Sequence, residues 1–373
     1  STLNADLQTT AYNSLGDRRG AVVALEPSTG KILALVSKPD FDPNTISENW
    51  DTLVNDETNS SLLNRATMGQ YPPGSTFKAA QALTFLQEGI IQENTPMFPC
   101  YHGFIHGSLK VGCHGHASPL PLVPALATSC NSYFCWGLYR MFGDRKYGSP
   151  QNAITVWKDH MVSQGFGYRL GVDLPGEGRG LIPNAAFYDK PYKGRWNGLT
   201  VISIAIGQGE ILATPLQIAN LSATIANRGH FITPHIVKEI QDNEIDSLYR
   251  TPRVPTIDRI HYEEVVKGMR AAVTGGTCRT AGYIFPDGEI CGKTGTAQNR
   301  GHDHSVFMGF APMNNPKIAI AVYVENGGFG ATYGVPIGAL MMEQYLNGKL
   351  SPASEVKATE FGDRIIMYGN EER

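Results

Sequence analysis

Three short groups of residues in this sequence combine a nucleophile, a base and groups that bind carboxylates. Ser75 and Lys78 lie three residues apart at the start of a predicted helix over residues 76–90, so their side chains share one face. A neutral lysine in this position can accept the proton of the serine hydroxyl and make the serine a competent nucleophile. Taken alone, so short a pair equally describes an N-cap serine beside a solvated lysine.

The second and third groups come later in the chain. Ser129 and Asn131 place a hydroxyl and an amide within an otherwise apolar, helix-like segment over residues 121–142. A hydroxyl there can relay a proton and an amide can orient a peptide, although helix capping explains the same residues. Residues 293–296 read Lys-Thr-Gly-Thr at the end of a predicted strand over residues 289–296. The lysine and threonines suit a carboxylate, and the glycine leaves room for a substrate along the strand edge.

The order of the three groups is more informative than any one of them. A Ser-x-x-Lys pair, a Ser-x-Asn about 50 residues later and a distant Lys-Thr-Gly form the shared signature of serine β-lactamases and penicillin-binding proteins. The chain resembles the transpeptidase domain of class B penicillin-binding proteins over essentially its whole length. The matching segments are residues 20–30, 71–78, 207–209, 213–217, 293–298 and 310–312. The form of residues 71–75 is most similar to the elongation-type penicillin-binding protein 2, with the division branch as the close alternative.

The resemblance implies a role for each motif residue. Ser75 would be the nucleophile that attacks the D-alanyl-D-alanine carbonyl of a stem peptide, and Lys78 would accept its proton. Ser129 would relay that proton to the leaving D-alanine, while Asn131 would orient the amide of the acyl donor. Burial and the nearby charge of Lys293 would lower the pKa of Lys78, as a base requires.

The remaining implied roles concern the carboxylate and the oxyanion. Substrate would bind along Lys293, Thr294, Gly295 and Thr296, with the lysine and both threonines contacting its terminal carboxylate. The backbone N–H groups of Ser75 and Thr296 would form the oxyanion hole. An amine of a second stem peptide would then attack the acyl-enzyme and close a cross-link. β-Lactams would acylate the same serine.

Other functions use the same acylation machinery and stay open at this point. A D,D-carboxypeptidase or a β-lactamase passes the acyl group to water, and a non-catalytic β-lactam sensor keeps the fold without turnover. A class A β-lactamase needs a loop glutamate that activates water. Residues 164–184 offer only Glu177, without the asparagine that usually accompanies it, so fast hydrolysis is disfavoured.

The elements that would position these groups follow from the apolar pattern. Residues 20–37 predict a β-hairpin around a turn at 26–30. Further strands are predicted at 289–296, 304–311 and 317–325. Helices are predicted at 76–90, 260–275 and 334–348, and within 210–228 after Pro215. Because the strands lie at both chain ends without βαβ alternation, the pattern favours one antiparallel sheet with a helix-rich middle inserted into it.

The predicted fold class is therefore α+β, which the resemblance specifies as penicillin-binding/β-lactamase-like. One transpeptidase domain is expected over residues 1–373. Within it, residues 1–75 and about 190–373 would contain the sheet, and about 76–190 would form the helix-rich inserted part. The resemblance also implies a transmembrane anchor and a pedestal domain, both of which are expected to be missing from this chain.

A cluster of cysteines and histidines precedes Ser129. His116 follows Cys113 at a spacing that suits Zn²⁺, Cys100 lies upstream, and Cys130 could approach from the next loop. We therefore expect a structural zinc site made by these four residues. A Cys100–Cys113 disulfide is the rival, and free cysteines beside loop histidines are the third alternative. No cofactor is expected for catalysis.

Composition excludes several other classes of protein. The 373 residues are 42% hydrophobic and 17% charged, which is enough apolar material for a sizeable core. The 31 Lys and Arg against 34 Asp and Glu give a net charge of -3 without a basic run, which argues against nucleic-acid binding. No stretch of about 18 apolar residues predicts a membrane span.

The resemblance places such a domain in cell-wall biogenesis and cell shape. Its active site would face the periplasm at the bacterial inner membrane. The expected partners are peptidoglycan stem peptides, β-lactam antibiotics and the polytopic membrane glycosyltransferase of the elongation machinery.

Overall fold

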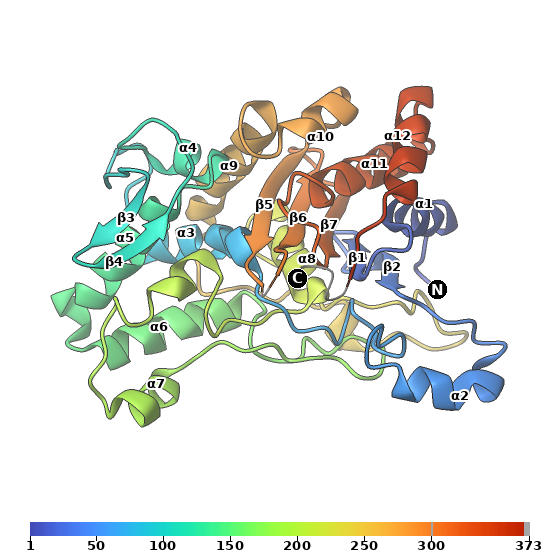
Figure 1. The fold of residues 1–373 in the computed structure, drawn as a ribbon, viewed down its shortest axis with the longest axis horizontal. Coiled ribbons are helices and arrows are strands. Elements are labelled where there is room, and N and C mark those ends of the chain that lie inside the picture. The colour runs from blue at the N-terminus through green and yellow to red at the C-terminus, as the bar shows by residue number, and fades with distance from the viewer. Residues whose placement is uncertain (300, 369–373) are drawn as a thin grey trace.

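The computed structural model describes residues 1–299 and 301–368. Its centre is an antiparallel sheet of five strands in the order β2–β1–β7–β6–β5 (Figure 1). These strands are β1 (Gly20–Leu25), β2 (Ile32–Lys38), β5 (Cys291–Ala297), β6 (His304–Ala311) and β7 (Ile318–Val324). The two ends of the chain share one sheet because β1 pairs with β7, as the strand pattern predicted.

Helices cover both faces of this sheet. One face carries α1 (Ala5–Leu15) and α11 (Gly334–Asn347), with α12 (Pro352–Asp363) packed against both helices. The other face carries α8 (Pro215–Ala226), which begins with a capping box at Thr214 and has no exposed residue. The sheet is thus the middle layer of three.

Alternate residues of β1 belong to two separate cores, because successive side chains of a strand point to opposite faces. Ala21 and Val23 pack in the core that contains α8, whereas Val22 and Ala24 pack with α1 and α11. All four side chains are fully buried. This two-sided burial explains why the strand reads as a continuous apolar run.

The remaining elements gather mainly beyond the β5 edge of the sheet (Figure 1). The helices there are α3 (Lys78–Gln87), α4 (Leu122–Ala127), α5 (Asn131–Gly143), α6 (Pro150–Ser163), α7 (Ala185–Tyr192) and α9 (Tyr262–Thr274). A small hairpin, β3 (Gly103–His106) and β4 (Leu109–Gly112), lies beside α5. α10 (Arg279–Ile284) contacts α9 and α11, and α2 (Ile46–Asn55) projects from the opposite end of the molecule. The boundaries of the inserted part, near residues 76 and 190, stay a prediction.

Most predicted elements are confirmed with shifts of a few residues at their ends. α3 is shorter than the predicted helix because the 3₁₀ helix η1 (Gly74–Phe77) leads into it and Gly89, at φ +65°, follows it. The apolar pattern did not predict α1, α2, α6, α7, α10, α12 or the small hairpin. α7 and α12 bury few residues, so neither gives a clear apolar periodicity.

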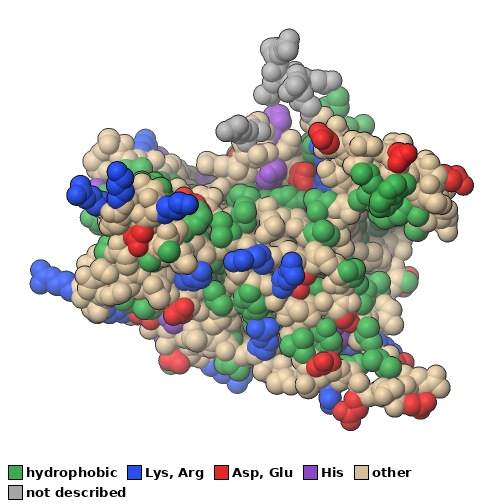
Figure 2. All heavy atoms as spheres, turned by 90° about the horizontal axis from the view of Figure 1, so that it is seen from below, with side chains coloured by type: hydrophobic (Ala, Val, Ile, Leu, Met, Phe, Trp, Pro, Cys, Tyr) green, Lys and Arg blue, Asp and Glu red, His purple; other side chains and the backbone are tan. Residues whose placement is uncertain are grey.

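The surface agrees with the nearly balanced charge of the sequence. Figure 2 shows acidic and basic side chains interspersed over one face of the molecule. Among residues 1–299 and 301–368, no helix combines the length and apolar character needed to cross a bilayer.

Candidate active site

The segment that carries Ser75 makes close backbone contacts with Gly207 on one side and with Gly295 of β5 on the other. Gly74 donates its N–H to the carbonyl of Gly207 at 3.0 Å. A Cβ on Gly207 would lie 2.1 Å from the carbonyl oxygen of Gly74, and one on Gly295 would lie 3.0 Å from that of Pro73. Glycine is therefore needed where this segment touches residue 207, and it permits the close approach of β5. These contacts bring Ser75 alongside the Lys-Thr-Gly-Thr strand.

Ser129 lies between the two lysines of the site. Lys78 Nζ donates to Ser129 Oγ at 3.2 Å and to the Ser129 carbonyl at 2.7 Å. Lys293 Nζ donates to the same Oγ at 2.8 Å. The two motif lysines thus converge on one hydroxyl, although they come from a helix start and a distant strand.

Asn131 completes this group. Its Oδ1 accepts a hydrogen bond from Lys78 Nζ at 2.6 Å, and its Nδ2 donates to the carbonyl of Gly112 at 2.7 Å. Both ends of the amide are therefore engaged, which fixes the orientation of the side chain. Ser75 lines the same cleft, and none of the described residues hydrogen-bonds to its hydroxyl.

Burial shifts the proton equilibria of both lysines. Both side chains are fully buried, and burial lowers the pKa of Lys78 to about 8. Burial and then repulsion from Lys78 hold the pKa of Lys293 well below its usual value. A lysine with such a pKa can be neutral near physiological pH, as a general base must be.

Ser129 adopts a backbone conformation that is uncommon for a serine. Its φ of +56° lies in the left-handed region, at the break between α4 and α5. The Cys130 side chain caps α5 by accepting from Tyr133 N–H, and α5 then begins at Asn131. The polar residues that interrupt the apolar segment 121–142 therefore form a tight turn between α4 and α5, and this turn directs Ser129 toward the lysines.

The cleft has a volume of about 760 Å³, and residues of all three motifs line it. Ser75, Ser129, Asn131, Thr294 and Thr296 all face it. Lys78 and Lys293 do not line it, because they lie behind Ser129. Every residue predicted for catalysis or substrate binding is therefore in this cleft or directly beside it.

Sequence reasoning missed several residues that line the same cleft. Thr277 receives a hydrogen bond from the Thr294 hydroxyl at 2.8 Å, and Gln208 Nε2 donates to the Thr296 carbonyl at 3.3 Å. Arg279 also lines the cleft. No local pattern distinguishes Thr277 or Arg279, whereas Gln208 falls in one of the segments that carried the resemblance.

Glu177 does not take part in this site. Its carboxylate accepts the backbone N–H groups of Leu170, Gly171 and Val172 at 2.7–3.1 Å, and its side chain is buried. It does not line the cleft. A carboxylate that caps a loop in this way is a structural group rather than a base for water.

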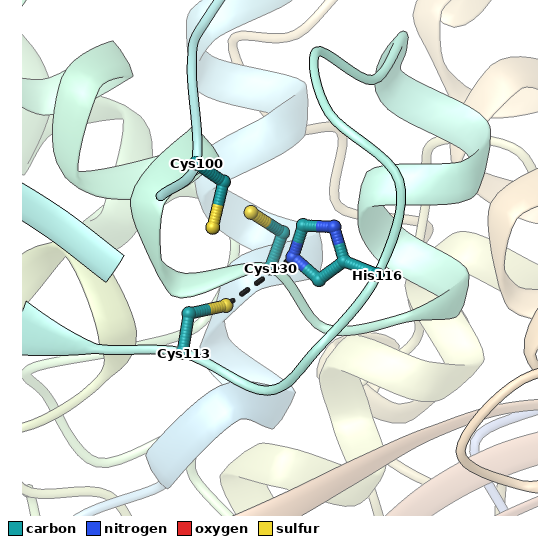
Figure 3. A group of neighbouring side chains, drawn as sticks. All are labelled: Cys100, Cys113, His116 and Cys130. Atoms are coloured by element: carbon teal, nitrogen blue, oxygen red, sulfur yellow. Dashed lines mark hydrogen bonds between the residues drawn. The ribbon is translucent and has the colours of Figure 1, made fainter. Parts of the chain in front are cut away.

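The four predicted metal ligands form a second cluster beside the site (Figure 3). The sulfurs of Cys100, Cys113 and Cys130 and a ring nitrogen of His116 all lie within 4.8 Å of one another. His116 Nε2 lies 3.4 Å from Cys113 Sγ, and its Nδ1 lies 2.6 Å from the carbonyl of Ala117. All six cysteines of the chain are free, so the Cys100–Cys113 disulfide is not formed.

This cluster fits the requirements of Zn²⁺. Three sulfurs and one imidazole are a common structural set, and tetrahedral ligands at zinc stand roughly 3.5–4 Å apart. Zinc-bound histidines usually donate their other ring N–H to a carbonyl, as His116 Nδ1 is placed to do toward Ala117. Small side-chain movements would close the four donor atoms around an ion.

The cluster is joined directly to the catalytic motif. Cys113 Sγ accepts the backbone N–H of Asn131 at 3.2 Å. The Ser132 hydroxyl donates to the carbonyl of Pro99, next to Cys100. The cluster therefore buttresses the start of α5, where Asn131 lies.

Comparison with known proteins identifies the family. Residues 20–343 match the model of the penicillin-binding protein transpeptidase domain, so the chain belongs to this family. It is 36% identical over 359 residues to the peptidoglycan D,D-transpeptidase MrdA of Acinetobacter baumannii. That match covers 89% of this chain and 51% of the relative. The chain thus spans about half the length of that relative and of the other MrdA proteins that it matches.

Solved structures show the same fold. Penicillin-binding protein 2 of Pseudomonas aeruginosa, in complex with WCK 5153, superposes with a TM-score of 0.80 at 34% identity, covering 95% of this chain and 80% of that one. Penicillin-binding protein A of Mycobacterium tuberculosis, as its penicillin G acyl-enzyme, gives a TM-score of 0.74 at 26% identity, covering 92% and 80%. The predicted α+β fold of the penicillin-binding class is therefore confirmed.

Proposed function

We propose that this chain is a peptidoglycan D,D-transpeptidase of the elongation type that works through an acyl-enzyme on Ser75. One observation carries the proposal. Ser129 Oγ accepts hydrogen bonds from both motif lysines beside a cleft that Ser75 lines. That arrangement joins a base to a proton relay in the cleft that the nucleophile lines.

In the proposed acylation, Ser75 Oγ attacks the carbonyl carbon of the penultimate D-alanine of a stem peptide. Lys78, in its neutral form, accepts the hydroxyl proton. The tetrahedral intermediate collapses, the peptide bond breaks, and the terminal D-alanine leaves with a proton relayed through Ser129. A pKa of about 8 keeps on the order of a tenth of Lys78 neutral at pH 7.

The backbone of the site supports the oxyanion assignment. Gly74 approaches Thr296 so closely that a Cβ on Gly74 would lie 3.0 Å from the Thr296 carbonyl oxygen. The N–H groups of Ser75 and Thr296 therefore belong to adjoining segments and could both serve the developing oxyanion. Thr294 and Thr296 would bind the terminal carboxylate, and Asn131 would orient the donor amide.

The second half-reaction removes the acyl group from Ser75 and regenerates the free enzyme. An amine of another stem peptide attacks the ester carbonyl, forms the cross-linking peptide bond and releases Ser75 with its proton restored. The structural role of Glu177 argues against rapid hydrolysis by water. A D,D-carboxypeptidase and a β-lactam sensor share the acylation step and differ only in the later fate of the acyl group.

We also assign Cys100, Cys113, His116 and Cys130 as the ligands of a structural Zn²⁺. The ion would tie the segment of residues 100–116 to the start of α5 and would take no part in the chemistry at the scissile bond. The N–H of Asn131 would then hydrogen-bond to a metal-bound sulfur, Cys113 Sγ, which fixes its position.

The proposed location and partner of this chain are based on what is seen for related proteins. Related penicillin-binding proteins have been seen in a peptidoglycan synthase complex and, in Helicobacter pylori, bound to MreC. We propose that this chain acts on the periplasmic face of the inner membrane beside a polytopic glycosyltransferase.

The test is intact-protein mass spectrometry after incubation with benzylpenicillin, followed by turnover of a stem-peptide donor with an amine acceptor. Wild type should gain one penicillin, and Ser75→Ala should gain none. Transfer to the amine would identify the transpeptidase, release of the donor to water the carboxypeptidase, and acylation with neither the sensor. Rapid loss of penicillin without a stable adduct would overturn the proposal in favour of a β-lactamase.

A further inference from the structure

A hydrogen bond outside the cleft joins the segment before Ser75 to the central sheet. Tyr71 opens the Tyr-Pro-Pro-Gly-Ser segment, and its hydroxyl lies 2.8 Å from Glu325 Oε1. The two residues are 254 positions apart, and Glu325 directly follows β7. Neither residue lines the cleft, and neither belongs to the three motifs. This contact therefore acts on the nucleophile, if it acts at all, through the backbone.

Tyr71 is the donor in this hydrogen bond. Burial, followed by the nearby charge of Glu325, raises the pKa of the Tyr71 hydroxyl, so the hydroxyl keeps its proton. The acceptor is a carboxylate oxygen that also receives Arg65 Nε at 2.8 Å. Hydrogen bonds to a charged acceptor are stronger than those between neutral groups.

The carboxylate of Glu325 is itself held in place. Arg65 is buried, and its two other guanidinium nitrogens donate to the carbonyls of Ser60 at 3.2 Å and Asn59 at 2.7 Å. The Tyr368 hydroxyl donates to the backbone carbonyl of Glu325 at 2.9 Å. The acceptor is thus fixed through both its side chain and its backbone.

A second side chain of β7 holds the next residue of the segment. Tyr323 is buried, and its hydroxyl donates to the carbonyl of Pro72 at 3.1 Å. Its ring stacks on that of Tyr71, with centroids 4.4 Å apart. Tyr71 also exchanges two backbone hydrogen bonds with Ala213, at 2.8 and 2.9 Å. Because the two prolines that follow have nearly fixed φ angles, little freedom remains between this anchor and Ser75.

The position of Ser75 depends on this backbone. Among residues 1–299 and 301–368, none hydrogen-bonds to the Ser75 hydroxyl. Lys78, by contrast, is fixed by its own hydrogen bonds to Ser129 and Asn131. The nucleophile and its base are therefore placed by separate sets of contacts. A misplacement of about 1 Å between reacting groups can slow a reaction about a hundredfold.

We propose that Glu325 is a positioning residue for acylation, which acts through the Tyr71 hydroxyl to hold the backbone that carries Ser75. This inference rests on the proposed function, because it concerns the nucleophile of that reaction. Since neither Glu325 nor Tyr71 lines the cleft, both should leave the binding of a ligand unchanged and affect the chemical step.

The first test is Tyr71→Phe, which keeps the stacked ring and the Arg65–Glu325 ion pair and removes the hydroxyl. The second-order rate of Ser75 acylation by benzylpenicillin should fall about tenfold to a hundredfold, the loss typical of a hydrogen bond to a charged group. Binding alone is measured by a ligand-observed NMR titration in a Ser75→Ala background, which cannot be acylated. There, Tyr71→Phe should change the dissociation constant of benzylpenicillin about twofold at most.

Two substitutions of Glu325 separate positioning from stability. Glu325→Gln keeps an oxygen for the Tyr71 hydroxyl, whereas Glu325→Leu removes it, and both break the buried ion pair with Arg65. Both variants should therefore lower the melting temperature. Only Glu325→Leu should slow acylation as much as Tyr71→Phe does, while Glu325→Gln should stay within about fivefold of the wild-type rate. The double variant Tyr71→Phe/Glu325→Leu should be no slower than Glu325→Leu alone, because both changes remove one interaction.

Tyr147→Phe is the matched control. The Tyr147 hydroxyl also donates to a carboxylate, Glu88 Oε2, at 2.6 Å, and neither of these residues lines the cleft. This variant should lose stability without slowing acylation.

Unchanged acylation in Tyr71→Phe would overturn the proposal, and so would equal slowing in Tyr71→Phe and Tyr147→Phe. Slowing that is explained by weaker binding in the Ser75→Ala background would overturn it too. Equal slowing in Glu325→Gln and Glu325→Leu would show that lost stability, not the acceptor oxygen, controls the rate. Failure of benzylpenicillin to acylate the wild type would instead overturn the proposed function, and the positioning role would fall with it.

Discussion

Lys293 Nζ donates to Ser129 Oγ at 2.8 Å across 164 residues of the chain. The same oxygen accepts from Lys78, so its two acceptor positions are filled by lysines. The proton of the Ser129 hydroxyl is consequently free to point to a third group. This geometry is what a relay needs if it is to pass a proton from Lys78 to a leaving amine.

The acylation rate should depend on pH in a direction set by Lys78. Its pKa of about 8 is lowered by burial, and only its neutral form can accept the proton of Ser75. The second-order rate with benzylpenicillin should therefore rise about tenfold per pH unit below the pKa and level off above it. A stopped-flow profile from pH 6 to pH 10 measures this rise. A flat profile would show that Lys78 is not the base.

Lys78→Arg is the sharper variant for the same step. Arginine keeps a positive charge at this position but does not release its proton at any usable pH. We expect the rate to fall by a factor of about 10²–10⁴, with no rise near pH 8. Near-wild-type acylation of this variant would contradict the assignment.

Ser129→Ala should leave both lysines without their shared acceptor. We expect acylation to fall about a hundredfold or more, and the free energy of unfolding to fall by about 1–3 kcal/mol for the unpaired buried donors. Ser222→Ala is the matched control, because it removes a buried hydroxyl that donates to the Gly309 carbonyl, and neither residue lines the cleft. Ser222→Ala should lose stability without slowing acylation, and a similar slowing in both variants would argue against the relay.

The purified protein should carry one zinc per chain. Native mass spectrometry should show the mass of one zinc ion, and denaturing spectra should show all six cysteines reduced. Cys113→Ser should lose the metal, lower the melting temperature and slow acylation, because Asn131 loses the sulfur that accepts its N–H.

Cys291→Ala provides the comparison for the zinc prediction, since Cys291 is buried within β5 and lies outside the cluster. This variant should retain its zinc. A deficit of two hydrogens in the non-reduced wild type would support the rival disulfide, and metal-free protein with every thiol reduced would contradict both assignments.

Gly207→Ala should damage the site through the backbone. A Cβ there would lie 2.1 Å from the Gly74 carbonyl oxygen, next to Ser75. Gly89→Ala separates this clash from conformational strain, because Gly89 has a similar positive φ and nothing within 4 Å of a Cβ. Gly89→Ala should cost about 1–2 kcal/mol of stability and spare acylation. Gly207→Ala should cost more and abolish acylation, as thermal melts and penicillin labelling would show.

Local patterns were enough to predict the five strands of the main sheet and the motif residues, but not the small hairpin of β3 and β4. β6 occupies the predicted residues, and β1 and β2 form the predicted hairpin, because apolar runs bounded by turn residues encode strands directly. The three motifs were recognised from residue type and order alone. By contrast, α7 and α12 have little apolar periodicity and were missed.

The sequence by itself determined which residues could do chemistry, since motif spacing and apolar periodicity are properties of neighbouring positions. Only the tertiary structure decided that Lys293 lies behind Ser129, that Thr277 holds the hydroxyl of Thr294, and that Cys100 meets Cys130. Those contacts join residues far apart in the chain. They exist because the pairing of β1 with β7 and the packing of β5 against η1 arise from many small, non-local interactions that no single segment encodes.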